Sequence, residues 1–321
     1  MTRTDYARAV CNLVGPSCLL IDEKDGWPAL IELQLSTGTV QASLHVGIIH
    51  SHARQAYEVR LQGPPGRGHP VTALPGTIPL IIGLWAATTP HVLVAAQPEI
   101  RVGIDKRLTI LFPDRLCLEA QQFGWAEPFR NKKDQLHWSF LPQLLPAFVE
   151  FYQGGLELPP KQIQIAVVGA GLVDAPDEAA SVRARQATTR LIRSARFGKT
   201  IVTAYDKKCA MCGLNFGLVS GAHILPVSAP TSTDHPTNGV ALCENHHRAF
   251  DRHLIHVHPA QRTIRLHPSI VARARHDAQT QAFVNAMYGT LVAPADPSFI
   301  PTQRMFEERY IYYKDDYKWV K

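Results

Sequence analysis

The stretch that decides the fold lies between residues 209 and 251. It reads Cys209-Ala-Met-Cys212, then Gly221-Ala-His223-Ile-Leu-Pro226, then Asn238-Gly-Val-Ala-Leu-Cys243-Glu-Asn-His246-His247-Arg-Ala-Phe250-Asp251. Cys209 and Cys212 are separated by two residues, and the same spacing returns between Cys243 and His246. Four sulfur and nitrogen donors in two close pairs are typical of a tetrahedral structural zinc site. We therefore predict that these four residues bind zinc and hold the ends of the segment together.

Three further polar residues of this stretch, His223, Asn238 and His247, carry a hydrolytic chemistry. His223 is predicted at the end of a strand, where a neutral imidazole can deprotonate water near pH 7. His247 and Asp251 are spaced i, i+4 on a predicted helix and share one face. We predict that this pair holds a divalent cation that stabilises a phosphodiester undergoing hydrolysis and its leaving O3′ oxygen. Asn238 is expected to tie the loop backbone and to orient His223.

The ordered string of these residues resembles the HNH (ββα-metal) endonuclease family, in the branch with an Ala-His-Ile-x-Pro box and a His-x2-Phe-Asp ending. The resemblance runs from about Phe197 to Leu266. It implies a β-hairpin followed by a helix that grips a catalytic metal. It also implies His223 as general base, Asn238 as orienting residue and His247 as metal ligand.

The metal ligands are where the chain departs from this family. Many members carry Asp or Glu directly before the first histidine, and here that position is Ala222. Asp251 is the first candidate to replace the missing ligand, with Asp234 and His235 as weaker ones. We expect Mg²⁺ or Mn²⁺ as the catalytic cation, although Ni²⁺ and Zn²⁺ also suit a His/Asp site.

Charge is distributed unevenly along the 321 residues. Residues 181–321 hold 19 Lys and Arg against 10 Asp and Glu, whereas residues 1–180 have a balance of −3. A basic segment favours a polyanionic partner. A helix predicted from residue 181 is rich in arginine, and no acidic residue follows until Asp206. We expect this helix either to contact DNA phosphates or to be a solvated linker. The candidate DNA-binding residues are Arg183, Arg185, Arg190, Arg193, Arg196 and Arg248.

The chain is predicted to be α+β, with two domains at residues 1–180 and 181–321. A short amphipathic helix over 4–14 precedes segments with strand patterning at 29–33, 40–49, 57–61, 78–85 and 91–95, and helices are expected at 116–123 and 141–152. This strand-rich N-terminal domain is the candidate recognition module. Its suggested DNA contacts are Arg67, the stretch 101–107 and the stretch 130–133. Trp27, Trp85 and Trp125 either build a pocket for an extruded base or belong to the core.

The layout as a whole is also similar, more loosely, to restriction endonucleases with a C-terminal HNH domain. We expect a restriction-type DNA endonuclease that acts on double-stranded DNA, modified or unmodified, and that dimerises to cut both strands. The chain has no apolar stretch long enough for a membrane helix and no signal-peptide pattern at its start, so a cytoplasmic protein is expected. Three alternatives stay open: a homing, toxin or nickase enzyme; an inactive zinc-stabilised DNA-binding protein; and a defence nuclease switched on by a small molecule or partner bound to residues 1–180.

Overall fold

A computed structural model describes residues 2–22, 26–52, 57–66, 68–131 and 134–320. Arg67, Lys132 and Lys133, three of the suggested contacts, lie outside these ranges. The chain divides into two compact units, Met1–Ile192 (unit 1) and Arg193–Lys321 (unit 2). The boundary proposed from the sequence at residue 180 falls near the start of the helix α5 (Glu178–Ala204), which contributes to both units. Across the described residues no helix is long and apolar enough to cross a bilayer.

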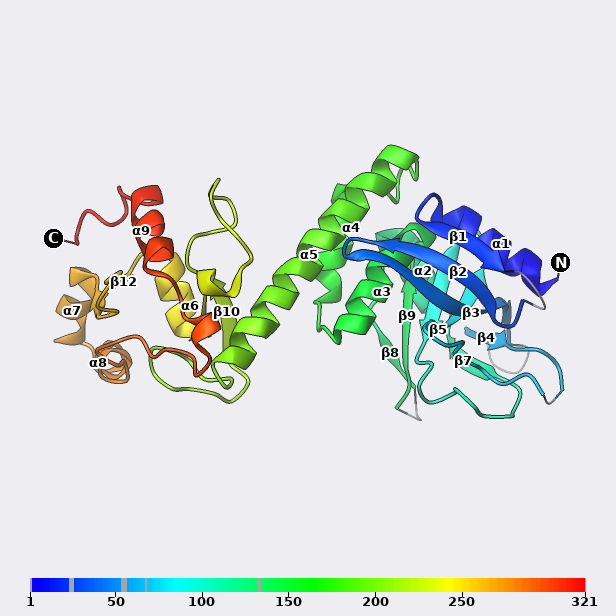
Figure 1. Cartoon of the computed structure of the whole chain (residues 1–321), viewed down its shortest axis with the longest axis horizontal. Coiled ribbons are helices and arrows are strands. Elements are labelled where there is room, and N and C mark those ends of the chain that lie inside the picture. Colours follow the sequence, from blue (N-terminus) through cyan, green and yellow to red (C-terminus); the bar gives the residue numbers. More distant parts are fainter. Residues whose placement is uncertain (1, 23–25, 53–56, 67, 132–133, 321) are drawn as a thin grey trace. The chain divides into compact units, whose positions relative to one another are not determined.

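Unit 1 is built on one large sheet with helices packed against it (Figure 1). Its strands are β1 (Cys18–Asp22), β2 (Ala29–Leu35), β3 (Gly38–Ser51), β4 (Glu58–Gln62), β5 (Ile78–Trp85), β6 (Val92–Ala96), β7 (Thr109–Pro113), β8 (Phe129–Arg130) and β9 (Leu136–Phe140). Its helices are α1 (Arg3–Val14), α2 (Arg115–Phe123), η1 (Pro142–Leu144), α3 (Leu145–Gly154) and α4 (Pro160–Gly169). The five predicted strands and the N-terminal helix are confirmed.

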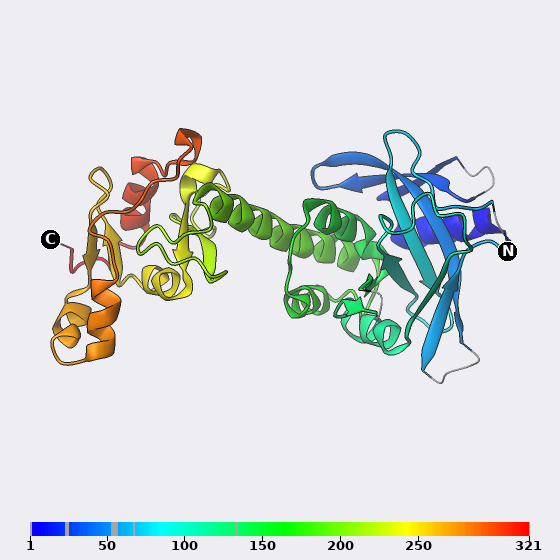
Figure 2. The same ribbon diagram turned by 90° about the horizontal axis from the view of Figure 1, so that it is seen from below.

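The sheet has the order β1-β2-β3-β5-β6-β9-β8, and β4 pairs with β3 and with β7. Only β3 and β5 run parallel among the described pairs, so the sheet is otherwise antiparallel. The long strand β3 continues past its pairing with β5 to meet β4, and Figure 2 shows it reaching across unit 1. Because β3 is long, its residues 46–50 lie where its pairing with β5 passes over to its pairing with β4, close to the start of α1.

The core of unit 1 is apolar and continuous. Strands β5 and β6 are buried on both faces, which explains their unbroken runs of aliphatic residues. Trp125 stacks on Phe140 with ring centroids 5.1 Å apart, and Trp85 is also buried, so these two tryptophans belong to the core. Trp27 is half-buried and lies edge-on to His45. The core interpretation of these rings therefore holds for two of the three.

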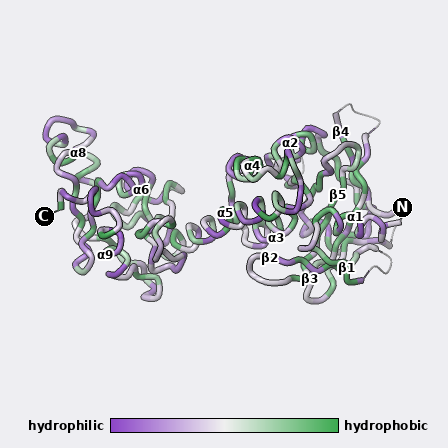
Figure 3. The backbone as a smooth tube through the Cα atoms, turned by 90° about the horizontal axis from the view of Figure 1, so that it is seen from above, coloured by the Kyte–Doolittle hydropathy of each residue, from purple (hydrophilic) through white to green (hydrophobic). Residues whose placement is uncertain are grey.

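Unit 2 begins in α5, along which Figure 3 shows hydrophilic and hydrophobic residues interleaved. Two small antiparallel sheets follow. The remaining elements are β10 (Val219–His223), η2 (Pro236–Asn238), β11 (Gly239–Cys243), α6 (Glu244–Asp251), β12 (Ile255–Val257), β13 (Ile264–Leu266), α7 (Pro268–Ala274), α8 (Ala278–Asn285), η3 (Pro297–Phe299) and α9 (Gln303–Tyr312). The α+β class, with a strand-rich N-terminal region and a C-terminal ββα segment, is confirmed.

The aromatic C-terminal tail packs on unit 2 itself. The Tyr310 hydroxyl accepts from the Val257 amide and donates to the Val257 carbonyl, both at 2.8 Å. Tyr317 donates to the carbonyl of Ile255, and the indole of Trp319 donates to that of His253. The tail therefore completes the core of unit 2 around β12.

Candidate hydrolytic site and zinc cluster

The site is assembled on the hairpin of β10 and β11 and on the helix that follows it without a break. His223, the last residue of β10, pairs with Gly239 at the start of β11. Cys243 ends β11 and is also the N-cap of α6, so His246 and His247 fall in the first turn of that helix. The strand–strand–helix order expected from the sequence thus places residues far apart in the chain beside one another.

Two glycines in the hairpin let α5 approach it closely. A Cβ at Gly239 would lie 2.3 Å from Ile201 Cδ1 and 2.8 Å from Phe197 Cζ. A Cβ at Gly221 would lie 2.8 Å from the Cα of Gly198. Because both strands lack a side chain at these points, the Phe197 ring reaches His223. The two rings stack with centroids 3.7 Å apart and an angle of 10° between their planes.

Cys209, Cys212, Cys243 and His246 are brought together as predicted. Their donor atoms all lie within 4.8 Å of one another. The Cys212 and Cys243 sulfurs are 4.0 Å apart, and His246 Nδ1 lies 3.1 Å from the Cys243 sulfur and 3.5 Å from that of Cys209. Sulfurs bound to one tetrahedral zinc at about 2.3 Å lie about 3.8 Å apart. The cluster therefore has the donors and the spacing to bind zinc.

Protonation of the cluster also suits a cation. Burial opposes ionisation of Cys209, but its hydrogen bonds with His246 and with backbone amides outweigh burial and lower its pKa to about 6. Burial raises the pKa of Cys212 and of Cys243. A bound divalent ion deprotonates such thiols. Among the described residues this is the one group of three or more His, Cys, Asp or Glu donors close enough to share an ion.

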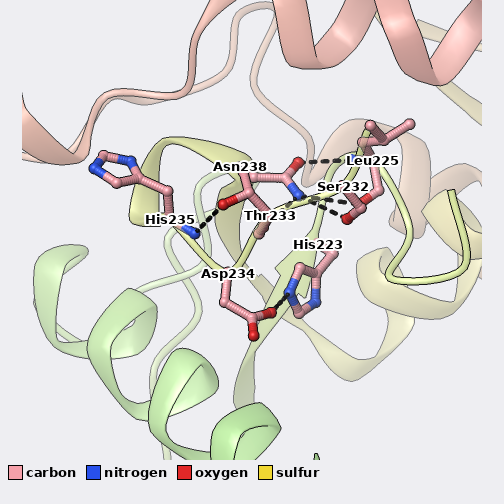
Figure 4. A network of polar contacts seen from close by, with 7 residues as sticks. All are labelled: His223, Leu225, Ser232, Thr233, Asp234, His235 and Asn238. Carbon is pink, nitrogen blue, oxygen red and sulfur yellow. Dashed lines mark hydrogen bonds and ion pairs between the residues drawn. The ribbon is translucent and has the colours of Figure 1, made fainter. Parts of the chain in front are cut away.

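His223 is held on two sides. Its ring rests on Phe197, and its Nε2 donates to Asp234 Oδ1 at 3.0 Å (Figure 4). Burial lowers the pKa of His223, Asp234 opposes that shift, and the charge of His247 adds to it. The ring is therefore neutral near pH 7. Asp234, considered from the sequence as a weak metal ligand, instead fixes the tautomer of this histidine.

Asn238 is fully buried and clamps the loop that follows β10 (Figure 4). Its Oδ1 accepts from the Leu225 amide at 2.8 Å. Its Nδ2 donates to the carbonyls of Leu225 and Thr233, at 3.0 and 2.9 Å. Its own carbonyl accepts from the Ile224 amide. Because the clamped loop runs from next to His223 to Thr233 and Asp234, Asn238 sets the position of the His223–Asp234 pair without touching it.

His247 projects from α6 toward β10. Its Nδ1 lies 2.7 Å from Ser220 Oγ, and its Nε2 lies 3.5 Å from Asp251 Oδ2. Ser220 also donates to Glu244. Ala222, in the place of the usual acidic ligand, is buried and offers no donor. His247 is half-buried and Asp251 is exposed. The ring of His235 places its Nδ1 2.8 Å from Thr237 Oγ1.

The six candidate DNA-binding arginines divide into different environments. Arg183 donates to the carbonyl of Ala170, and the half-buried Arg185 bonds Ser17, so both are tied into unit 1. Arg190 and Arg193 are exposed, and Arg196 is half-buried. Arg248 lies on α6, one position after His247.

Sequence reasoning missed the supporting role of four residues, one of which, Asp234, it had considered only as a metal ligand. Phe197, Ser220, Asp234 and Arg309 hold the site residues in place. The glycine at each strand of a predicted hairpin was a signal that a helix packs closely there. No comparable sequence pattern predicts the role of Arg309, which lies far along the chain from the other site residues.

The stretch that carries the site matches a known protein family. The family described as "HNH endonuclease" matches residues 209–258. The chain matches no curated protein. A solved structure described as "Modification dependent TagI restriction endonuclease" matches 85% of this chain and 81% of its own, at 13% identity and with a TM-score of 0.33.

Proposed function

With residues 209–258 forming an HNH endonuclease domain, we propose that this endonuclease is of restriction type and hydrolyses phosphodiester bonds in double-stranded DNA. The observation that carries the proposal is the arrangement around His223. A neutral imidazole at a strand end, stacked on Phe197 and bonded to Asp234, lies within electrostatic reach of His247. General-base hydrolysis of a phosphodiester needs such a group beside a cation-binding pair.

His223 is the general base of the proposed reaction. Asp234 accepts a hydrogen bond from the Nε2–H group of His223, so the lone pair of the ring is on Nδ1. Nδ1 makes no hydrogen bond within the described ranges and is available to a water molecule. The base takes the proton of that water as its oxygen attacks phosphorus.

His247 and Asp251 hold the catalytic cation, and Mg²⁺ or Mn²⁺ fits this donor pair. The bound ion supplies charge stabilisation for the phosphate and the leaving oxygen. Ser220 orients His247 through Nδ1 and leaves Nε2 toward Asp251. Two protein donors leave the remaining positions to water and to the DNA phosphate, which is how Mg²⁺ is commonly bound.

The Cys209–Cys212–Cys243–His246 cluster binds structural zinc in this proposal. It joins the turn before β10 to the junction of β11 and α6, directly beside His247. A two-stranded hairpin with one short helix has little core of its own, so a metal clip fixes the geometry of the site.

Unit 1 selects the DNA in this proposal, by sequence or by base modification. It is a separate compact unit with its own core, as a recognition module requires. The acidic balance of residues 1–180 favours a second candidate, in which unit 1 binds an effector and gates the nuclease. Because one HNH site makes one strand break, cutting both strands requires a homodimer or two visits.

The test is cleavage by the full chain with Mg²⁺ or Mn²⁺. Plasmid and phage DNA would carry no modification, methyladenine, methylcytosine or hydroxymethylcytosine. We expect discrete fragments from one substrate and a loss of at least about 100-fold in rate for His223→Ala, with DNA affinity retained. His276→Ala, an exposed histidine of unit 2, is the matched control. Cleavage retained in His223→Ala removes the assigned base, and no cleavage of any substrate by the wild type favours the gated enzyme.

A further inference from the structure

A cavity of about 690 Å³ opens in unit 1, and none of its lining residues belongs to the hydrolytic site or to the cysteine cluster. It is lined by the beginning of α1, by residues 46–50 of β3, by residues following β4 and by Arg107. Cavities of about 300 to 1,000 Å³ are the ordinary size for small-ligand sites. The cavity lies on one compact unit and is independent of the hydrolytic site.

The lining is basic. It includes Arg3, Arg107 and His50, and no Asp or Glu is among its described residues. Burial lowers the pKa of Arg3, Tyr6 opposes the shift, and the charge of Arg107 lowers it further, so the two guanidinium groups are close enough to repel. Neither arginine forms an ion pair with a carboxylate in the described part of the chain. Like charges held together without a counter-ion favour an anionic ligand.

A third arginine faces the same region. Arg60 on β4 is the direct cross-strand partner of His50 on β3, so the two side chains share one face of the sheet. The Arg60 Nε is buried and has no hydrogen-bond partner among the residues described. Arg60 itself does not line the cavity, but its partner His50 does. Buried donors in proteins are almost always paired, so an unpaired one beside a lining residue indicates a missing acceptor.

The orientation of the groups suits a phosphate. Arg107 Nε donates to the carbonyl of Gly63 at 3.3 Å, and its terminal nitrogens make no hydrogen bond to any residue that the structure describes. Arg3 lies over the ring of Trp27, with 5.8 Å between Cζ and the ring centroid. Guanidinium groups bind phosphate oxygens in pairs of parallel hydrogen bonds. The volume exceeds that of a lone phosphate, and the half-buried Tyr6 ring adds an aromatic surface at the wall.

We propose that this cavity binds the phosphate of a nucleotide, with Arg3 and Arg107 on the phosphate oxygens and His50 and Arg60 at its edge. Two sources share this chemistry: an internal phosphate of a DNA strand and a free nucleotide. Binding of either ligand to unit 1 does not require that residues 209–258 cut DNA, so the inference does not rest on the nuclease activity.

The experiment measures binding by the full chain without added Mg²⁺ or Mn²⁺, so that cleavage plays no part. Calorimetry would use pyrophosphate and deoxynucleoside 5′-monophosphates, and fluorescence anisotropy would use a labelled DNA duplex. We expect Arg3→Gln and Arg107→Gln each to weaken binding about tenfold, as the loss of a charge-assisted hydrogen bond does. Lys161→Gln removes the same charge from an exposed residue of α4, which does not line the cavity, and should leave affinity within about twofold.

The outcomes separate the sources and can overturn the proposal. Binding of mononucleotides and pyrophosphate identifies a free nucleotide, and a response confined to the duplex identifies a strand phosphate. If a glutamine variant fails to fold, a competition experiment with Arg107→Lys, which retains the charge, takes its place. Pyrophosphate should displace the labelled duplex from Arg107→Lys as it does from the wild type. Equal affinities of the wild type, Arg3→Gln and Arg107→Gln for every probe would overturn the assignment.

Discussion

Unit 1 and unit 2 reach a stable fold by different means. Unit 1 buries a continuous apolar core between the large sheet and its helices. The sheets in unit 2 have two strands each, and isolated hairpins of that kind are marginal in water. Its buried centre includes two cysteines, His246 and the charged Arg309, and the third cysteine of the cluster, Cys212, is half-buried. Unit 1 therefore rests on a large apolar core, whereas unit 2 combines a smaller apolar core with a few residues that carry special chemistry.

The histidines of the two units show the same contrast. His45 in unit 1 is fully buried, and both ring nitrogens are engaged, by the Thr72 amide and by the Leu80 carbonyl. Burial lowers its pKa to about 4, so it is a neutral packing element. His223 is held through one nitrogen only. A histidine with a free nitrogen at a partly open position has the capacity for proton transfer that a fully satisfied one lacks.

The largest expected effect comes from removing the zinc cluster. Cys209→Ser, or a strong chelator, should unfold unit 2 while unit 1 stays folded, because structural zinc contributes about 10 to 16 kcal/mol of binding free energy. Zinc content measured by mass spectrometry should fall from one ion per chain toward zero. Calorimetry should show loss of one of two unfolding transitions. Cys117→Ala, a buried cysteine of unit 1, is the control and should retain zinc. Unchanged zinc content in Cys209→Ser would remove the cluster as a zinc site.

Arg309 is the second special residue of unit 2. Its guanidinium donates to the carbonyls of Ile224 and Phe250, at 2.8 and 2.6 Å, and to the Tyr317 hydroxyl at 3.0 Å. It thus joins α9 to the strand end after His223 and to the end of α6. Arg309→Met would keep much of the volume and leave these buried acceptors unpaired. We expect unit 2 to lose about 3 to 5 kcal/mol of unfolding free energy in urea titrations.

The matched control for Arg309 lies on the same helix. Arg304 is 71% exposed and pairs with Glu308 one turn away. Arg304→Met should change stability by less than about 1 kcal/mol, because exposed ion pairs contribute little. Equal effects of the two substitutions would show that the buried clamp does not set the stability of unit 2.

Those features that depend on the pattern of neighbouring residues could be predicted from the sequence. Apolar strand patterning located β2 to β6, and the spacing of Cys209, Cys212, Cys243 and His246 predicted a cluster that the structure assembles. The HNH domain was predicted from its ordered motif, and the family match confirms it. Short strands such as β8 and the edge strand β1 were not predicted, since two to five residues carry little periodicity.

Contacts between distant segments were beyond the reach of the sequence. Phe197 marked only the start of the family resemblance, and its stacking on His223 depends on the missing side chains of Gly221 and Gly239. Asp234 was considered a weaker candidate metal ligand because it lies in the loop before Asn238 and Ala222 replaces the usual acidic ligand. Its bond to Nε2 of His223 arises from the loop that Asn238 clamps, and loop geometry is not encoded in spacing.

The smallest expected effect is a shift in the pH profile, and it tests whether His223 differs from His45 as a working base. The pKa of His223 is lowered by burial, so the acidic limb of kcat/KM should lie below the ordinary histidine value of about 6.5. Asp234 raises this pKa against the effect of burial, and Asp234→Asn removes that charge. The limb should then move to lower pH. The plateau rate should fall, because the imidazole of His223 becomes a weaker base and is held less firmly in place. Asp315→Asn, an exposed acid paired with Lys318, should leave the limb unchanged. A limb that moves to higher pH in Asp234→Asn would mean that His223 does not titrate as the base, because losing a neighbouring carboxylate can only favour its neutral form.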